Sequence, residues 1–175
     1  MCGVMDCSVA YGRARTQGAI LGERRWIGLI GWLLLCYLAG IVGAQFSPDA
    51  WYAALAKPGW TPPGAVFSVV WSVLFTLMAI AAWLVWREHR FDRARTALSL
   101  FLIQLALNVG WSALFFGARS PALALGDIVL LWAAVLATIV AFWRLNRAAS
   151  LLLAPYLAWV SFAAALNFEI WRLNR

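Results

Sequence analysis

Side chains that could bind a ligand recur on one face of an apolar segment in the middle of the chain. These side chains are Gln104, Asn108, Trp111 and Phe115. Each follows the previous one by four, three and four residues, which places all of them on one face of a helix. Amide side chains inside a membrane are costly unless they face the protein interior or a cavity. Amides beside aromatic rings suit a planar apolar molecule with a polar edge. The face therefore predicts a non-covalent binding site, and core packing of the same side chains is the alternative.

The chain has 12 tryptophans, eight of which form two groups by position. Those at the ends of apolar runs are typical interface anchors: Trp26, Trp86, Trp143 and Trp171. Those placed deeper are Trp71, Trp111, Trp132 and Trp159. On their helical faces, Trp71 is joined by Phe75 and Met78, and Trp159 by Phe162 and Leu166, beside Ala163 and Asn167. These deep rings extend the predicted pocket, or else they pack the core.

Few residues could do covalent or metal chemistry. Cys2, Cys7 and Cys36 lack metal-ligand spacing and His89 is the only histidine, so we expect no disulfide framework and no metal site. Asp127 lies about one to two turns inside an apolar run, where a carboxylate is a functional candidate and a structural role is the alternative. We find no nucleophile elbow and no phosphate-binding glycine loop, and we expect no required cofactor.

Long apolar helices must position these side chains. Hydrophobic residues make up 65% of the 175 residues and charged residues 12%, with a mean hydropathy of +0.81. Soluble domains are about half apolar and about a quarter charged. Five runs reach the ~20 residues that cross a bilayer, at about 26–46, 64–86, 96–118, 121–143 and 148–170. Because the runs are continuous and not alternating, they predict an all-α polytopic membrane protein, a five-helix bundle after a polar tail at 1–25.

The basic residues predict how the bundle is oriented. With five spans, 10 of the 14 Lys and Arg residues fall on the side of the N-terminal tail and 4 on the other. The positive-inside rule then places the N-terminus in the cytoplasm and the 47–63 loop outside. The net charge of +7 comes from arginines between the spans, which suit lipid headgroups, so we expect a lipid bilayer and no nucleic acid as partner.

Small residues follow the third run on the face opposite Asn108. Ala106, Gly110, Ala113 and Gly117 recur at helical spacing, about 200° away from the polar face. Such stripes let helix backbones approach closely. The stripe predicts either packing within one chain or the seam of a homodimer.

Three sequence blocks resemble those of a known family. The first runs Trp51-Tyr-Ala-Ala-Leu-Ala-Lys-Pro-Gly-Trp-Thr-Pro-Pro63, followed by Phe67 and Val70-Trp71. The second has Gln104-Leu-Ala-Leu-Asn108, Trp111-Ser112 and Phe115-Phe116, and the third has Pro155-Tyr156, Trp159, Phe162-Ala163 and Leu166-Asn167. In order and spacing over about residues 28–175, the chain resembles the TspO/MBR family of tryptophan-rich sensory and translocator proteins.

The resemblance implies a five-helix fold, often dimeric, that binds porphyrins and, in some members, sterols or benzodiazepine-type ligands. Protoporphyrin IX is then the expected ligand. The loop after the first span would cover the pocket with Trp51, Tyr52 and Pro62. The other pocket residues implied are Trp71, Phe75, Asn108, Trp111, Trp159, Ala163 and Leu166, beside Gln104 from the polar face.

Three functions follow from this resemblance. The first is a sensor or carrier of tetrapyrroles, and the second is a light-dependent porphyrin-degrading enzyme that uses Trp51 and Trp159 as redox residues. The third is a transporter of sterols or other lipids. Phe168 stands where the sterol motif of animal members needs a tyrosine, which weighs against cholesterol.

Overall fold

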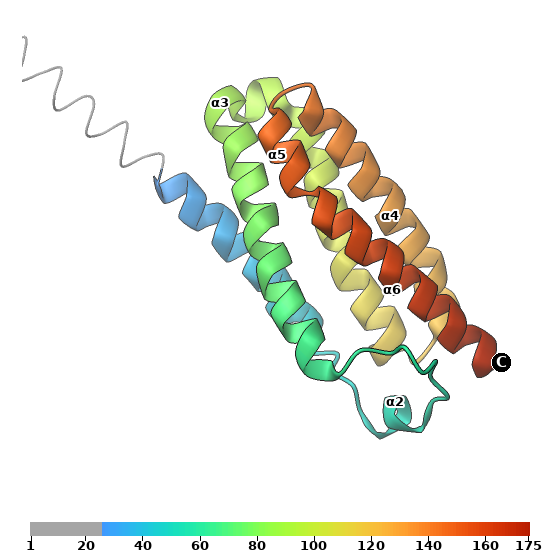
Figure 1. Cartoon of the computed structure of the whole chain (residues 1–175). Coiled ribbons are helices and arrows are strands. Elements are labelled where there is room, and N and C mark those ends of the chain that lie inside the picture. Colours follow the sequence, from blue (N-terminus) through green and yellow to red (C-terminus); the bar gives the residue numbers. More distant parts are fainter. Residues whose placement is uncertain (1–25) are drawn as a thin grey trace, which may run out of the picture.

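The structure, a computed structural model, describes residues 26–175 apart from the side chains of residues 90–93. Its elements are a first helix at Trp26–Ala44, α2 (Ala50–Ala54), α3 (Gly64–Ser112), a π-helical turn η1 (Ala113–Gly117), α4 (Pro121–Trp143), α5 (Arg147–Leu152) and α6 (Ala154–Leu173). They form one elongated bundle (Figure 1). The tail at 1–25, with Cys2, Cys7 and four of the arginines, lies outside the described residues.

Five helical segments are long and apolar enough to cross a membrane, which confirms the all-α, five-span prediction. They are Trp26–Ala44, Gly64–His89, Ala94–Gly117, Pro121–Trp143 and Arg147–Leu173. Their outward side chains include Leu34, Val69 and Leu130, which are 61–67% exposed within the chain. Water cannot solvate such surfaces at low cost, so the hydrocarbon of a bilayer must cover them.

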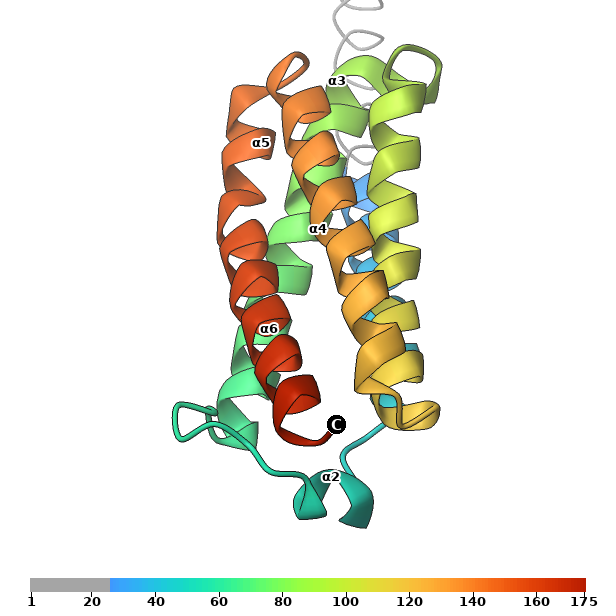
Figure 2. The same ribbon diagram turned by 90° about the vertical axis from the view of Figure 1, so that its right-hand side faces the viewer.

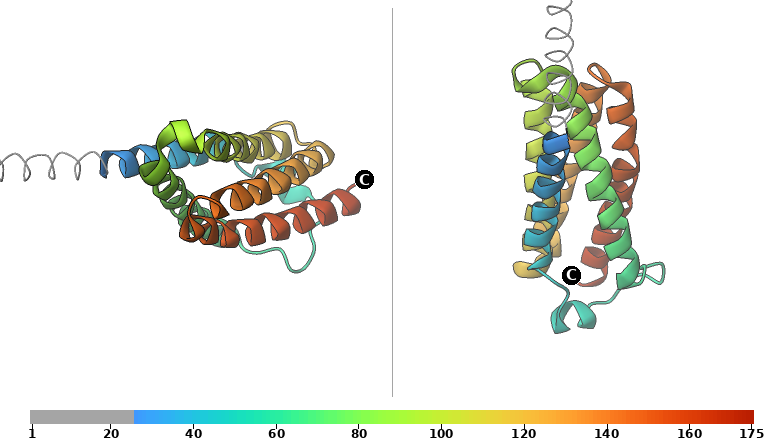
Figure 3. Two further views of the ribbon diagram at one scale, coloured as in Figure 1. Left: turned by 90° about the horizontal axis from the view of Figure 1, so that it is seen from above. Right: turned by 90° about the vertical axis from the view of Figure 1, so that its left-hand side faces the viewer.

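The charged connector predicted at 87–95 does not interrupt the helix. Helical backbone continues through α3 from Gly64 to Ser112, and the ribbon folds back on itself at the end far from α2 (Figures 1 and 3). The connector contains neither proline nor glycine, and its Arg and Glu residues favour helix. The charge run therefore separates two apolar spans, Gly64–His89 and Ala94–Gly117, without a break in helical backbone.

The fifth span, predicted as one helix, is divided at Leu153 into α5 and α6. Pro155 has no N–H to donate to the carbonyl of Leu151, and its ring crowds that carbonyl. The backbone forms a tighter turn at this point, in which the Leu153 N–H donates to the Ser150 carbonyl at 3.1 Å. The step redirects α6 across the bundle toward the end that carries α2 (Figure 2).

The core lies between α3, α4 and α6. Phe101 stacks on Phe142 with ring centroids 6.1 Å apart, and Met78 and Tyr156 are fully buried beside them. The first helix packs along α3 (Figure 3). The Trp32 ring meets Phe101 edge-on, with ring centroids 5.6 Å apart. This packing joins all five spans, and four of them, all but α4, line a cavity near one end.

The two ends of the bundle differ in what they carry. The α2 segment and the C-terminus share one end, and the turn of α3 and the α4–α5 connection share the other (Figures 1 and 2). This grouping agrees with the alternating spans assumed for the charge count. The cytoplasmic placement of the N-terminus stays a prediction that reporter fusions at both termini would test.

Candidate ligand pocket

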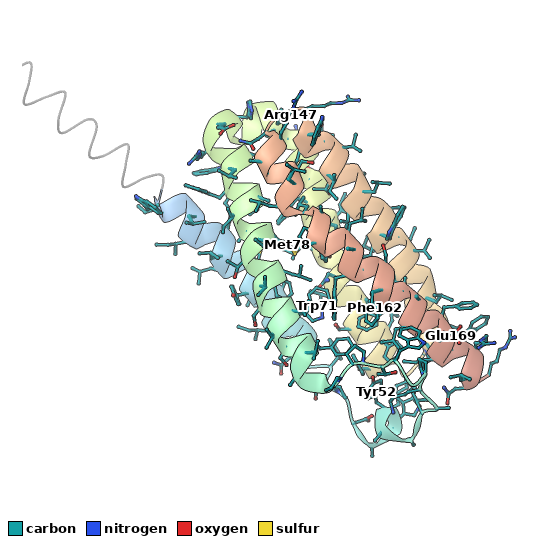
Figure 4. The ribbon with its side chains drawn as sticks, in the orientation of Figure 1. Tyr52, Trp71, Met78, Arg147, Phe162 and Glu169 are labelled. Atoms are coloured by element: carbon teal, nitrogen blue, oxygen red, sulfur yellow. The ribbon has the colours of Figure 1, made fainter. Side chains whose placement is uncertain are left out.

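A cavity of about 500 Å³ lies inside the bundle at the end that carries α2. Its walls come from the first helix, both halves of α3, η1 and α6, and residues 45–63, which we call the lid, close its end. In Figure 4, Trp71 and Phe162 lie in this half of the bundle, with Tyr52 of the lid beyond them. The volume falls within the ~300–1,000 Å³ of small-molecule sites.

Eight of the eleven residues predicted to bind ligand line this cavity. They are Tyr52, Pro62, Trp71, Phe75, Asn108, Trp111, Ala163 and Leu166. The other three, Trp51, Gln104 and Trp159, lie outside the lining. The structure thus brings together residues more than a hundred positions apart, and their binding of a ligand stays a prediction.

The polar face of the third span points inward. The Asn108 amide donates from Nδ2 to the Tyr156 hydroxyl at 3.2 Å, and Asn108 is only 7% exposed. Trp111 Nε1 donates to Asn167 Oδ1 at 2.9 Å, and Asn167 Nδ2 donates to the Pro121 carbonyl at 2.8 Å. These bonds tie α3, α6 and the start of α4 together at pocket height. They also hold the indole by its edge, which leaves its ring for stacking.

Gln104, one helical turn from Asn108, is buried without a partner. It is 1% exposed, and neither Oε1 nor Nε2 has a hydrogen-bond partner among the described residues. A buried unpaired amide costs ~1–3 kcal/mol. The spacing correctly put Gln104 on the inward face, but at a depth below the cavity.

Aromatic rings stack from the third span into the lid. Trp111 stacks on Phe115 at 5.1 Å, Phe115 meets Phe116 at 4.9 Å, and Phe116 meets Tyr52 at 5.4 Å between ring centroids. The π-helical turn η1 contains both phenylalanines, and its wider turn lets two successive rings face the cavity. The α-helical spacing found Phe115 and missed Phe116 for this reason.

The first helix gives the cavity a flat wall that sequence reasoning missed. Ala39, Gly40, Gly43 and Ala44 line it. A Cβ at Gly40 would lie 2.7 Å from the Phe75 ring, so only glycine lets the two approach so closely. The clue in the sequence was four small residues on one face of an otherwise bulky span.

Lys57 is the one basic side chain among the described residues that line the cavity. Its Nζ donates to the carbonyls of Ala53 and Leu55 at 3.2 Å and lies 4.6 Å from the centroid of the Tyr52 ring. Burial raises the pKa of Tyr52, which keeps its phenol neutral. The mouth of the pocket therefore offers one positive charge.

Polar contacts tie the lid to the bundle. Asp49 caps α2 by accepting from the Tyr52 N–H at 3.1 Å, and Arg119 donates to Asp49 Oδ2 at 2.7 Å. Arg119 has a positive φ of 51°, unusual for a residue other than glycine. At the other side, Asn174 bonds both the N–H and the carbonyl of Ala56, at 3.0 and 2.9 Å.

We expect acid to loosen the lid. The Tyr52 N–H, and after it Arg119, lower the pKa of Asp49 below its ordinary value of 3.8. A carboxylate with a lowered pKa stabilises the folded lid above its unfolded pKa, and that contribution is lost as pH falls through the lowered value. Hydrogen exchange of the α2 amides, corrected for intrinsic rate, should therefore accelerate in acid. Asp49→Ala should show the fast exchange already at neutral pH, and slow exchange in that variant would contradict the assignment.

Trp51 and Trp159, the residues considered for redox chemistry, flank the cavity. Trp51 packs edge-on against Phe115 at 6.1 Å. Trp159 meets Phe67 at 5.5 Å and Phe162 at 5.3 Å on the outer side of α6, and its Nε1 is buried without a partner in the described part of the chain. One aromatic ring separates each from the space where a ligand would lie.

Two members of the small-residue stripe pack within the chain. A Cβ at Gly110 would lie 3.2 Å from Asp127 Oδ1, and one at Gly117 would lie 2.8 Å from the Phe46 ring. Ala106 is exposed and Ala113 half-buried. Intramolecular packing thus accounts for both glycines, and the homodimer stays a prediction. Asp127 faces this crossing of α3 and α4, and its Oδ2 lacks a partner among residues 26–175.

No group of three or more His, Cys, Asp or Glu residues within the described residues could hold a metal ion. The lining combines aromatic rings, small side chains, two amides and one ammonium group. Such a set can stack, donate hydrogen bonds and attract an anion.

A family model and individual known proteins match this chain over most of its length. The sequence pattern of the TspO/MBR family matches residues 32–172. The chain is 47% identical to the tryptophan-rich protein TspO of Chlorobaculum tepidum over 147 residues, which covers 80% of this chain and 91% of the relative. It is 40% identical to the human translocator protein over 154 residues, with 85% and 91% covered. It is 39% identical to the tryptophan-rich sensory protein of Cereibacter sphaeroides over 149 residues, with 85% and 92% covered.

Proposed function

The chain belongs to the TspO/MBR family, and we propose that it is a membrane receptor or carrier that binds a tetrapyrrole in the pocket under the lid. It is an integral membrane protein with five spans, so its ligand can reach it through the bilayer as well as through water. The observation that carries the proposal is an aromatic cavity, partly closed by the lid, whose lining among the described residues holds one ammonium group, that of Lys57.

The cavity has large aromatic side chains on some of its walls and small residues on another, which suits a flat ring. Trp71 and Trp111 supply large π-faces, and the small residues Gly40 and Gly43 leave room opposite bulkier groups. Stacking of a flat nucleobase on an aromatic side chain is worth about 1–3 kcal/mol, and we expect the same range for a tetrapyrrole ring on each indole. Asn108, at the edge of the cavity, can bond a polar atom of the ring system in addition to Tyr156.

The charge at the lid favours a ligand with carboxylates. Lys57 Nζ makes two bonds to backbone carbonyls and has a third proton to donate. A propionate of protoporphyrin IX could accept that proton while the macrocycle stays in the apolar part of the cavity. A neutral sterol would leave this ammonium group without a counter-ion, which ranks it below a porphyrin.

The test is a titration of the purified protein with protoporphyrin IX in lipid nanodiscs. We expect saturable, one-site quenching of tryptophan fluorescence. Lys57→Met should weaken binding of the dicarboxylate more than that of its dimethyl ester. Quenching that rises linearly without saturation would overturn the proposal.

A second function, light-dependent porphyrin degradation, is favoured by one contact. Trp51 packs on Phe115, which in turn stacks on the cavity residue Trp111. Under light, oxygen can take an electron from the excited porphyrin, and the porphyrin cation left in the cavity could then draw an electron from Trp51 across the Phe115 ring. Irradiating the saturated complex in air tests this: a changing porphyrin spectrum in the wild type but not in Trp51→Phe, with equal binding, would support an enzyme.

A further inference from the structure

An apolar groove of about 590 Å³ runs along the outside of the bundle between α3 and α6. Val69, Val73 and Leu77 form its α3 side, and Pro155, Ala158 and Trp159 form most of its α6 side. Every one of these side chains is apolar apart from the indole N–H. The groove faces the membrane, because it lies within two of the spans and its α3 residues Val69 and Val73 are 65% and 53% exposed.

One layer of aromatic rings separates this groove from the pocket. Phe67 lines the pocket, and on its other side it meets Trp159, which lines the groove, at 5.5 Å. Phe162 continues the wall toward the lid, where Trp60 covers it at 5.6 Å. Side chains alone, without intervening backbone, therefore divide the two spaces.

The wall has no polar ties. In the described part of the chain, no hydrogen bond or ion pair joins residues 64–77 to α6. The Trp159 indole has no hydrogen-bond partner among the residues that the structure describes, so turning the ring away breaks no hydrogen bond there. The opposite side of α6 differs, because Asn108–Tyr156 and Trp111–Asn167 bonds tie it to the third span.

The lid is the other conceivable entrance, and it is tied down. Its two ends are held by the Asp49–Arg119 ion pair and by the paired bonds between Asn174 and Ala56. Opening the lid must break these polar contacts, whereas parting Phe67 from Trp159 breaks apolar contacts and no hydrogen bond or ion pair among the described residues. Ring pairs of this kind are worth ~0.5–1.5 kcal/mol.

From these contacts we infer that the α3–α6 groove is a lateral portal, where a flat ligand dissolved in the bilayer first docks and then passes between Phe67 and Trp159. The inference rests on the proposed binding of a tetrapyrrole. Val69 is about 7.5 Å along α3 from Gly64 and Leu77 about 20 Å, at 1.5 Å per residue. The groove thus starts near the membrane surface and reaches the bilayer interior. A planar amphiphile could enter it with its carboxylates still at headgroup level.

The portal can be blocked without touching the pocket. Val73 and Ala158 line only the groove, and Val73 is 53% exposed. The double variant Val73→Phe with Ala158→Phe fills the groove. Its matched control is Val140→Phe with Ala133→Phe on the lipid side of α4, where Val140 is 50% exposed. Each protein is placed in lipid vesicles and mixed with protoporphyrin IX in a stopped-flow instrument that follows tryptophan quenching.

We expect the groove variant to associate and dissociate about tenfold more slowly, with Kd within about twofold of wild type, because a blocked route changes both rates alike. The control variant and Asn174→Ala, which loosens the lid, should keep wild-type rates. Unchanged rates in the groove variant, or faster association in Asn174→Ala, would overturn the portal. Non-saturable quenching in the wild type would instead overturn the proposed binding itself.

Discussion

Replacing Trp71 by alanine is expected to weaken protoporphyrin binding by ~30- to 100-fold, which corresponds to the loss of one stacking face worth about 2–3 kcal/mol. Trp71 lines the pocket from α3, and its ring is held against Phe75 at 5.4 Å and Tyr156 at 6.1 Å. These contacts fix the indole before a ligand arrives, so little ordering cost is paid on binding. Equilibrium quenching in nanodiscs measures the change.

A matched control distinguishes a loss of ligand binding from a general destabilisation of the fold. Trp132 is also an intramembrane tryptophan, but it bonds Ser161 on the side of α6 away from the pocket, and it is 37% exposed. Trp132→Ala should therefore leave Kd within about twofold of wild type, since no interaction with the ligand is removed. Trp71→Phe should recover part of the lost affinity. Equal losses in Trp71→Ala and Trp132→Ala would show that Trp71 acts only through the fold.

The five spans were predictable because bilayer thickness fixes the length of an apolar helix. The inward direction of Asn108 and Trp111 was predictable for a related reason, since a buried amide in a membrane needs a partner. Both arguments depend on local sequence and a known solvent. Neither needs the positions of the other helices.

The depth of a side chain within the bundle, and whether it faces the cavity or the lipid, were harder to predict. Gln104 shares a face with Asn108, yet the cavity ends one turn short of it, because its floor is set by side chains from other spans. Trp159 shares a face with Phe162 in the sequence, and the structure puts both on the outer wall. The tilt of α6 decides this, and it follows from the break at Leu153 and from packing against α4, which no single span encodes.

The lid also contains features that neighbouring residues in the sequence do not predict. Its prolines marked an irregular loop, and Tyr52 and Pro62 indeed line the cavity. The contacts that hold it come from distant positions: Arg119 lies 70 residues from Asp49, and Asn174 lies 118 residues from Ala56. Such pairs of ordinary surface residues leave no pattern in one sequence.

Asn167→Leu is expected to lower the free energy of unfolding by about 2–4 kcal/mol, because it leaves two polar groups unpaired inside the membrane. Asn167 accepts from Trp111 Nε1 and donates to the Pro121 carbonyl while only 1% exposed. Leucine has the same number of side-chain heavy atoms, so the change removes hydrogen bonds with little change in volume. Thermal or SDS-induced unfolding of the protein in detergent measures the loss.

Gln104→Met is the matched comparison, since Gln104 is equally buried but its amide has no partner among the described residues. Removing an unpaired buried amide should leave stability unchanged or raise it by ~1 kcal/mol. A loss of stability in Asn167→Leu without a loss in Gln104→Met distinguishes hydrogen bonding from burial as the source of stability at this depth. If Gln104→Met instead destabilised as much as Asn167→Leu, the amide of Gln104 would have to be paired in the membrane. The network of hydrogen bonds on the inward face would then extend one turn deeper than the cavity.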